Sequence, residues 1–337
     1  MWIVRPARHE DLAGIEKLAT AHGARVSTLP QSRDKLSEKI DHSQRSLAGD
    51  PALADRERFL FVLEDSDTGR IHGTAGIDAR AGNSQPFYNY RRDELIHASH
   101  ELDVAKRVAV LYPTHELTGK TLLCSFTIDP DLRDTEAFEL LSRSRLLFVD
   151  RHRERFSDDV VVEIQGVQTE EGDAPFWDSL GRHFFHMDFA TADYYSGVKT
   201  KTFIAELMPP NPIYVTLLSD AAQAAISEPH EAAARTCQLL GREGFRVGQH
   251  IDIFDGGPVL EARTDELTSI TRRRNKTARR GEGSRGVRYL VANGECESFR
   301  CSLTNVSDGL GDVVRLNTTI ADQLGVSDGD DLVLVAL

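Results

Sequence analysis

The sequence has few cysteines, no long apolar run and no excess of basic residues. Its four cysteines are scattered over 337 residues without a C-x-x-C pair, so neither a disulfide framework nor a metal site is expected. No window reaches the ~18 consecutive apolar residues of a membrane span, and the first residues lack the layout of a signal peptide. A net charge of −13 disfavours nucleic acid and anionic membranes as main partners. These absences predict a globular protein of the cytoplasm.

The length permits a sizeable core, in two domains or in one large domain with an appendage. One stretch departs from the acidic balance, because six basic residues lie between positions 272 and 280 and a glycine-rich segment follows. We interpret it as a solvated helix end and linker rather than a nucleic-acid or phosphate patch. The predicted organisation is one region over 1–270, with possible subregions 1–200 and 201–270, a basic linker over 271–287, and a small domain over 288–337.

Hydrophobic periodicity predicts a mixture of strands and helices in the larger region. Leu12, Ile15 and Leu18 recur at helical spacing, and a turn-rich link at 65–70 joins two apolar runs that are typical of a hairpin. An apolar strand at 121–128 leads through a turn into a helix. Strands are expected at 2–5, 58–64, 71–77, 121–128 and 159–166, and helices at 8–19, 32–47, 135–151 and 175–185.

Beyond residue 288 the pattern changes to short strands. These are expected at 289–292, 298–303, 313–316 and 331–335, with one helical turn at 319–324. The fold class predicted from the whole pattern is α+β, with a mixed sheet flanked by helices and a small C-terminal β-barrel-like appendage.

Several sequence blocks in one order carry a resemblance to known proteins. They are F-V-L-E-D-S-D-T-G (61–69), F-Y-N-Y-R (87–91) with I-H-A-S (96–99), P-F-W-D-S-L-G-R-H-F-F (175–185), F-I-A-E-L-M-P (203–209) and I-D-I-F-D-G-G-P (251–258). Together they resemble the arginine N-succinyltransferase family over essentially the whole chain, and the order of elements resembles the wider GCN5-related N-acyltransferase superfamily. S-F-T-I (125–128) and R-Y-L-V-A-N-G (288–294) look like the alpha-type chain of the two-subunit arginine/ornithine enzyme.

The resemblance implies transfer of a succinyl group from succinyl-CoA to the α-amine of L-arginine or L-ornithine in arginine catabolism. The amine would attack directly in a ternary complex, so no cofactor would be bound permanently and succinyl-CoA would be a co-substrate. A homologous beta-type subunit or further copies of the chain would be the partners. Two alternatives stay open: a weakly active or regulatory alpha subunit that needs a homologous partner, and an N-acyltransferase with another acyl donor or amine.

A catalytic residue and a donor-binding residue are carried over from the family. His230 precedes a predicted helix and aligns with the family's proposed proton donor, where a helix N-terminus favours a neutral imidazole. Phe126, in the strand at 121–128, aligns with a succinyl-CoA contact that the main chain could make by pairing with the pantetheine arm. Cys124, in the same strand, is not expected to act as a nucleophile.

The loop that binds the CoA pyrophosphate in the superfamily departs from its pattern here. The motif R/Q-x-x-G-x-G/A brings backbone amides against the phosphates at a helix N-terminus. Arg133 aligns with its first position, but Glu136 and Phe138 stand where glycines belong. A carboxylate repels the phosphates and a bulky ring denies close approach. We therefore predict that this chain alone binds succinyl-CoA poorly and works with a homologous subunit whose loop is intact.

The amino-acid substrate needs an anionic group for its side-chain cation and a cation for its carboxylate. Asp252 and Asp255 are candidates for the first role. Arg91 is a candidate for the second role, or for binding the succinyl carboxylate. The competing interpretation of the Asp-Gly-Gly-Pro segment is a tight turn without a substrate role.

Overall fold

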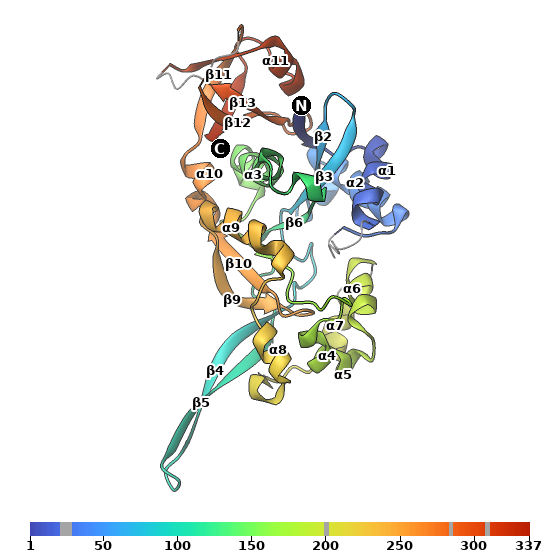
Figure 1. Cartoon of the computed structure of the whole chain (residues 1–337), viewed down its shortest axis with the longest axis vertical. Helices are drawn as coiled ribbons and strands as arrows, with labels where there is room; N and C mark the ends of the chain where they lie inside the picture. Colours follow the sequence, from blue (N-terminus) through green and yellow to red (C-terminus); the bar gives the residue numbers. More distant parts are fainter. Residues whose placement is uncertain (21–28, 199–201, 283–285, 307–310) are drawn as a thin grey trace. The chain divides into compact units, whose positions relative to one another are not determined.

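The computed structural model describes residues 1–20, 29–198, 202–282, 286–306 and 311–337 (Figure 1). The chain forms two compact units. The first unit comprises residues 1–80, 121–158 and 263–337, and the second comprises residues 81–120 and 159–262. The chain therefore leaves the first unit and returns to it twice, which a division along the sequence at residue 270 does not capture. Among the described residues, no helix is long and apolar enough to cross a membrane.

The first unit is built on one sheet with the strand order β14-β11-β15-β12-β13-β1-β2-β3-β6. The predicted hairpin is present as β2 and β3, which pair antiparallel, and β1 pairs antiparallel with the other edge of β2. The strands are β1 (Trp2–Pro6), β2 (Arg58–Asp65), β3 (Arg70–Asp78), β6 (Thr121–Ile128), β11 (Arg274–Arg280), β12 (Val287–Asn293), β13 (Cys301–Val306), β14 (Val313–Leu316) and β15 (Asp331–Ala336).

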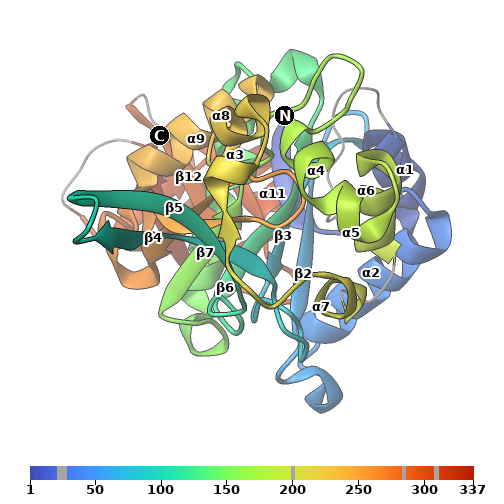
Figure 2. The same cartoon turned by 90° about the horizontal axis from the view of Figure 1, so that it is seen from below.

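Helices cover both faces of β2, as its alternating side chains require. Leu60 and Val62 pack in a core cluster with residues of α1 (Leu12–Thr20) and α2 (Arg33–Leu47). Phe59 and Phe61 contact the ring of Phe148 in α3 (Glu136–Arg151), with ring centroids 5.0 Å apart in each pair. Since neighbouring residues of a strand point to opposite faces, α1 and α2 lie on one face and α3 lies on the other (Figure 2).

The tail carries the predicted strands and the predicted helical turn, here α11 (Thr318–Leu324). The prediction of a basic linker is wrong in part. Arg274–Arg280 forms β11, which pairs parallel with β14 and antiparallel with β15. A four-residue helix, α10 (Thr268–Thr271), precedes it. Residues 283–285, which complete the predicted linker, lie outside the described residues. The tail strands enclose their own core, and β13 pairs with β1, so the tail continues the sheet of the first unit.

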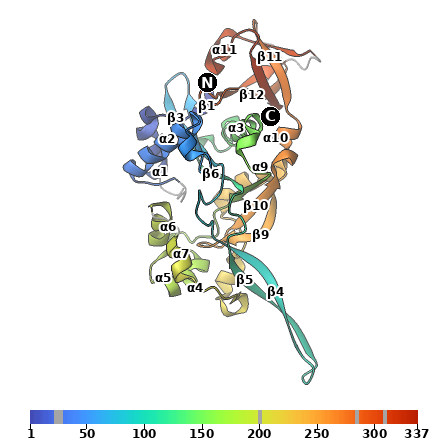
Figure 3. The same ribbon diagram turned by 180° about the vertical axis from the view of Figure 1, so that it is seen from behind.

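The second unit has the strand order β7-β10-β9-β4-β5-β8. Its strands are β4 (Asn89–Ser99), β5 (Val104–Thr114), β7 (Asp159–Glu163), β8 (Ile213–Tyr214), β9 (Arg246–Asp252) and β10 (Pro258–Arg263). Short helices gather around a core centred on Trp177, Phe176 and Phe254 (Figure 3). They are α4 (Pro175–Ser179), α5 (Gly181–Phe185), α6 (Phe189–Val198), α7 (Thr202–Leu207) and α8 (Asp220–Ala225), while α9 (Ala234–Glu243) contributes no residue to this core.

Candidate functional site

Strand β6 carries a bulge at its centre. Thr74 of β3 is opposite Thr127, while Gly76 is opposite Cys124, so β6 has one extra residue between these two positions. Ser125 lies in the left-handed region with φ of 50°, which is uncommon for a residue with a side chain. The Thr74 hydroxyl donates to the Ser125 carbonyl oxygen at 2.7 Å and holds this conformation. Bulges of this kind redirect the strand and occur often next to active sites.

A buried arginine from α3 lies behind the bulge. The Arg145 guanidinium is 3% exposed, and its Nη1 lies 3.4 Å from the Gly76 oxygen and 3.5 Å from the Cys124 oxygen. Burial lowers the pKa of Arg145 to about 10, so the group stays charged at neutral pH. Arg145 is thus a fixed positive charge that binds the carbonyls on both strands at the bulge. Sequence reasoning missed it, because an arginine within a helix carries no sign of burial.

The side chain of Phe126 points toward α3, and two side chains of that helix contact it. The Phe138 ring contacts it edge to face with centroids 5.2 Å apart, and the Arg145 guanidinium lies 5.1 Å from its centroid. This packing leaves the main chain of Phe126 as the part that could pair with a pantetheine arm. The succinyl-CoA contact at Phe126 therefore stays a prediction of main-chain binding.

Cys124 is a buried thiol rather than an activated one. Its side chain is 8% exposed, and burial raises its pKa to about 11. A thiol with that pKa is almost fully protonated at neutral pH, whereas a nucleophilic cysteine needs the thiolate.

We expect Cys124→Ala to keep turnover within about threefold of the unchanged protein, because direct attack needs no acyl-enzyme. Steady-state rates and a test for covalent labelling by the acyl donor would check this. A loss of about a hundredfold or more in a folded variant would contradict the expectation.

The loop before α3 leads into a helix whose N-terminus is capped in the usual way. The Thr135 hydroxyl accepts the Ala137 backbone N–H at 3.3 Å and donates to the Leu132 oxygen at 2.8 Å. The predicted phosphate ligand Arg133 is half-buried and follows the short 3-10 helix Pro130–Leu132. A phosphate at this helix end would have to compete with Thr135 for the first free amide.

The two residues in the glycine positions point in different directions. Glu136 is exposed and pairs with Arg288 of β12, whose Nε and Nη2 both lie 3.0 Å from Glu136 Oε2. Phe138 is only 3% exposed and packs against Phe126. The prediction that the Phe138 ring obstructs the loop is therefore wrong, since the ring belongs to the core. The carboxylate remains, but a cation that the sequence did not reveal neutralises it.

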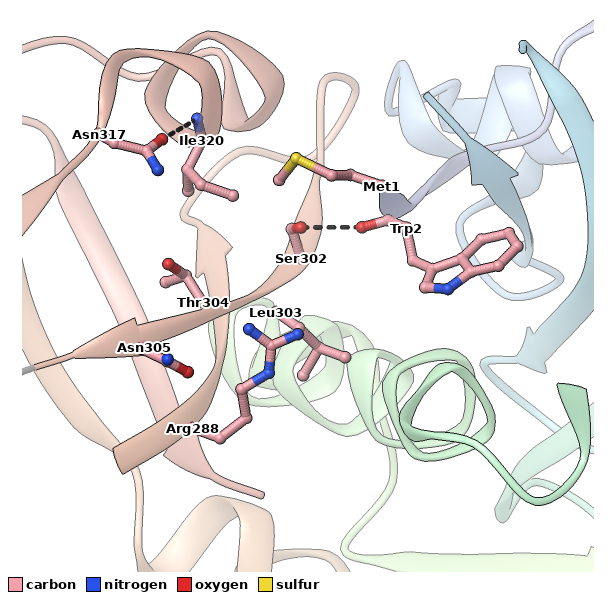
Figure 4. A pocket seen from close by; sticks show the side chains of 9 residues that line it. All are labelled: Met1, Trp2, Arg288, Ser302, Leu303, Thr304, Asn305, Asn317 and Ile320. Carbon is pink, nitrogen blue, oxygen red and sulfur yellow. Dashed lines mark hydrogen bonds between the residues drawn. The ribbon is translucent and has the colours of Figure 1, made fainter. Parts of the chain in front are cut away.

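A pocket of about 440 Å³ lies where the tail meets β1 in the first unit, and Arg288 lines it (Figure 4). Two of its polar groups already have protein partners. The Ser302 hydroxyl donates to the Trp2 oxygen at 2.8 Å, and Asn317 caps α11 by accepting the Ile320 N–H at 2.8 Å. None of the predicted site residues lines this pocket.

His230 begins the 3-10 helix Glu231–Ala233 that leads into α9. Its Nδ1 accepts the Ala232 backbone N–H at 3.0 Å, and its own backbone N–H donates to the Gln165 oxygen at 2.8 Å. Because Nδ1 accepts a hydrogen bond, the neutral ring must carry its proton on Nε2. The half-buried His230 therefore has its hydrogen-bond donor at Nε2, and the catalytic role carried over from the family stays a prediction.

The turn that holds Asp252 and Asp255 supports the segment that ends at His230. Asp255 is 7% exposed, and its two carboxyl oxygens accept the backbone N–H groups of Gly166 at 2.7 Å and Gly257 at 2.8 Å. Gly166 also forms a β-bridge with Pro229, next to His230. Asp252 accepts the backbone N–H groups of Phe254 and Asp255. Both carboxyls accept backbone N–H groups in a tight turn, which agrees with the competing interpretation of this segment. Their role in substrate binding stays a prediction.

The Asp255 carboxyl should make stability depend on pH. Burial raises its pKa from 3.8 to about 8, and the neighbouring Asp252 charge adds to the shift. A carboxyl whose pKa is higher in the folded protein binds more protons there, so stability falls as pH rises between these two values. We expect urea denaturation to show a larger loss of unfolding free energy from pH 5 to pH 8 than in Asp255→Asn. Equal slopes for the two proteins would contradict the assignment.

Arg91 belongs to a chain of charged groups that sequence reasoning did not connect. It pairs with Glu116 at 2.7 Å, and Glu116 lies 3.2 Å from His250 Nε2. His250 Nδ1 in turn lies 3.0 Å from Glu261, which also pairs with Lys120 at 3.0 Å. The hydrogen bonds from His250 and Lys120 lower the pKa of Glu261 to about 2. Arg91 also lies 3.5 Å from Asp93, so a substrate carboxylate would have to compete with two carboxylates of the protein.

The predicted site residues fall into two groups. Phe126 and Arg133 belong to the first unit, while Arg91, His230, Asp252 and Asp255 belong to the second. Within the second unit Asp255 and His230 are joined through the segment at 165–166, and Arg91 lies opposite His250 on β9. The described residues hold no cluster of His, Cys, Asp or Glu suited to a metal ion.

Comparison with known proteins identifies relatives over the whole length. The family described as "Arginine N-succinyltransferase beta subunit" matches residues 2–269, and its C-terminal domain family matches residues 274–336. The arginine N-succinyltransferase subunit alpha of Pseudomonas aeruginosa is 43% identical over 338 residues, with all of both chains covered. The arginine N-succinyltransferase of Enterobacter sp. is 40% identical, covering 100% of this chain and 98% of the relative. The structure of arginine/ornithine succinyltransferase subunit AI from P. aeruginosa superposes with a TM-score of 0.93 at 41% identity, covering 100% of this chain and 98% of the other.

Proposed function

Because the chain belongs to the arginine N-succinyltransferase family, we propose that it transfers the succinyl group of succinyl-CoA to the α-amine of L-arginine. The observation that carries the proposal is similarity over the full length, with relatives at 38–43% identity that bear this name. The bulged strand β6, which leads through a short 3-10 helix into α3, supports it, because this is the element that the acyltransferase resemblance implies for the acyl donor. Transfer to ornithine is the finer possibility that the name of the similar P. aeruginosa structure suggests.

The reaction forms one bond and breaks one. The neutral α-amine attacks the thioester carbonyl carbon, a C–N bond forms, and the C–S bond to CoA breaks. The CoA sulfur then needs a proton and the amine nitrogen releases one. We assign to the Nε2–H of His230 a hydrogen bond to the departing sulfur, and the proton that the amine nitrogen releases passes through solvent to the CoA thiolate.

The remaining predicted residues are assigned to the acyl donor or to the amino-acid acceptor. The main chain around Phe126 would pair with the pantetheine arm, in the way that an added strand pairs with a sheet edge. Arg133 would contact the pyrophosphate. Arg91 would hold a carboxylate of one substrate, and Asp252 is the better candidate for the arginine guanidinium because the Asp255 carboxyl is buried.

A homologous subunit or further copies of the chain are the proposed partners, and the cytoplasm is the proposed location. The P. aeruginosa relative is named as a subunit, whereas the Enterobacter relative is not. A regulatory chain with little activity of its own is the second candidate function. The observation that favours it is Glu136 in a glycine position, although Arg288 neutralises its charge.

One assay separates these functions. Purified chain is incubated with succinyl-CoA and arginine, with ornithine or acetyl-CoA in parallel arms, and with or without a homologous chain that has glycines in its loop. Release of CoA thiol and formation of succinylarginine by the chain alone would support the enzyme. Turnover only with the homologous chain would support the dependent subunit, and turnover only with another donor or amine would overturn the substrate assignment.

A further inference from the structure

Strands β4 and β5 form a long hairpin, called here the arm, that extends beyond the body of the second unit (Figures 1 and 3). Each strand has eleven residues, and they pair along their whole length from Asn89–Thr114 to Ser99–Val104. Strand β9 pairs only with positions 89–91, and β8 only with positions 110–111. Beyond these positions both edges of the arm lack a neighbouring strand among the described residues. An isolated two-stranded hairpin is at best marginally stable in water. We therefore expect a partner to stabilise the part of the arm beyond its base.

The exposed apolar residues of the chain point to the same surface. Leu102, Ile96 and Val104 of the arm are 74%, 69% and 52% exposed. Leu217, which is 82% exposed, lies in the 3-10 helix Val215–Leu217 that contacts β5. The three most exposed large apolar side chains in the described residues are therefore on the arm or against it. Apolar patches and free sheet edges of this kind are typical of surfaces that another chain covers.

The charged residues of the arm indicate which kind of partner would bind it. The segment 89–114 holds four basic and four acidic residues and so has no net charge, in a chain whose net charge is −13. These charges alternate in pairs along the arm. From the base to the tip the pairs are Arg91 with Arg92, then Asp93 with Glu94, then Lys106 with Arg107, and finally Glu101 with Asp103.

This order is complementary to itself when it is reversed. Because neighbouring residues of a strand point to opposite faces, one member of each strand pair lies on a given face, and Arg92, Glu94, Ile96 and Arg107 share one face of the arm. If a second arm lies against this face, antiparallel about a two-fold axis near Ile96, Arg92 at the base faces the acidic tip of the partner. Glu94 then faces the partner's Arg107, and Ile96 occupies the centre. A two-fold contact requires such a match of one surface with itself.

We propose that the arm is a dimerisation surface that takes the arm of a second copy of this chain, antiparallel and about a two-fold axis. This deepens the oligomer part of the proposed function and rests on it only there, because the surface is defined by assembly and not by turnover. Within one chain Arg107 and Glu94 form an exposed ion pair at 3.2 Å. Exposed pairs of this kind contribute little, so their exchange for partner charges is not opposed.

A charge exchange tests the arrangement. One variant carries Lys106→Glu with Arg107→Glu, and the other carries Asp93→Lys with Glu94→Lys. Alone, each variant places like charges against each other across the two-fold axis, and we expect its dimer to dissociate about tenfold to a hundredfold more readily than the unchanged chain. An equimolar mixture restores opposite charges at both contacts, so it should recover dimerisation. Sedimentation equilibrium over a concentration series measures all three, and recovery also shows that both variants are folded.

A second variant keeps the test decisive if the charge variants fail to fold. Ile96→Cys replaces an exposed residue near the proposed axis and should give a disulfide-linked dimer under mild oxidation. Val313→Cys, at a 51% exposed position of β14, is the matched control and should not. Turnover is not the readout, so an inactive chain that dimerises would still support the arm. A monomeric unchanged chain, no recovery in the mixture, or equal cross-linking of the two cysteine variants would overturn the proposal.

Discussion

Replacing His230 with alanine is expected to lower turnover by about two to three orders of magnitude, as the loss of one hydrogen-bond donor to developing negative charge does. The physical reason is the tautomer that the structure imposes. Nδ1 accepts the Ala232 N–H at 3.0 Å, so the proton of the neutral ring is on Nε2, where it can donate a hydrogen bond to the departing sulfur. Steady-state kinetics at saturating succinyl-CoA and arginine would measure the effect.

His230 also caps the helix that follows it, and a matched variant separates the two roles. An asparagine at an N-cap accepts the same backbone N–H through its side-chain oxygen, but it is too short to place a donor at the position of Nε2. His230→Asn should therefore keep the stability of the unchanged protein and share the low turnover of His230→Ala. His230→Ala should lose about 1 kcal/mol of stability in addition. Full turnover in His230→Asn would show that the histidine serves only as a cap.

The parts of the fold that the sequence predicts are those whose signal is local. In β2 the continuous apolar run Phe59–Leu60–Phe61–Val62 predicts a strand, and this strand is buried on both faces. The helices α1, α2 and α3 also lie largely within the ranges predicted for helices at 8–19, 32–47 and 135–151. The same is true of the tail strands.

The parts that were missed depend on partners distant in sequence. β11 has four basic residues in seven positions and was interpreted as a linker, yet it forms a strand because β14 and β15 supply its hydrogen bonds. The arm was not predicted as a hairpin, since its charged pairs interrupt the apolar alternation in both strands. For the site, the sequence placed His230 and Glu136 in the correct local setting at helix starts. It could not show the ion pair of Glu136 with Arg288, because the two residues are 152 positions apart.

The ion pair also changes which variant tests the phosphate loop. The sequence alone suggests replacing Glu136 and Phe138 together by glycine. Phe138 is buried against Phe126, however, and loss of a buried phenylalanine side chain costs about 3–5 kcal/mol. The double variant would therefore weaken the fold, and a failure to bind succinyl-CoA could not be assigned to the loop. Glu136→Gln alone is the informative change, since that side chain is exposed.

We expect Glu136→Gln to strengthen succinyl-CoA binding by the isolated chain about tenfold. It removes a carboxylate from the phosphate-facing end of α3, and it frees Arg288 to pair with a phosphate. Calorimetric titration of the unchanged chain should accordingly show weak binding, and addition of a homologous chain with an intact loop should restore turnover. Arg288→Gln is the matched control: it leaves Glu136 without its cation and should weaken binding about tenfold further. Low-micromolar binding with full turnover by the unchanged chain alone would contradict its dependence on a partner, and an unchanged affinity in Glu136→Gln would show that the phosphates lie elsewhere.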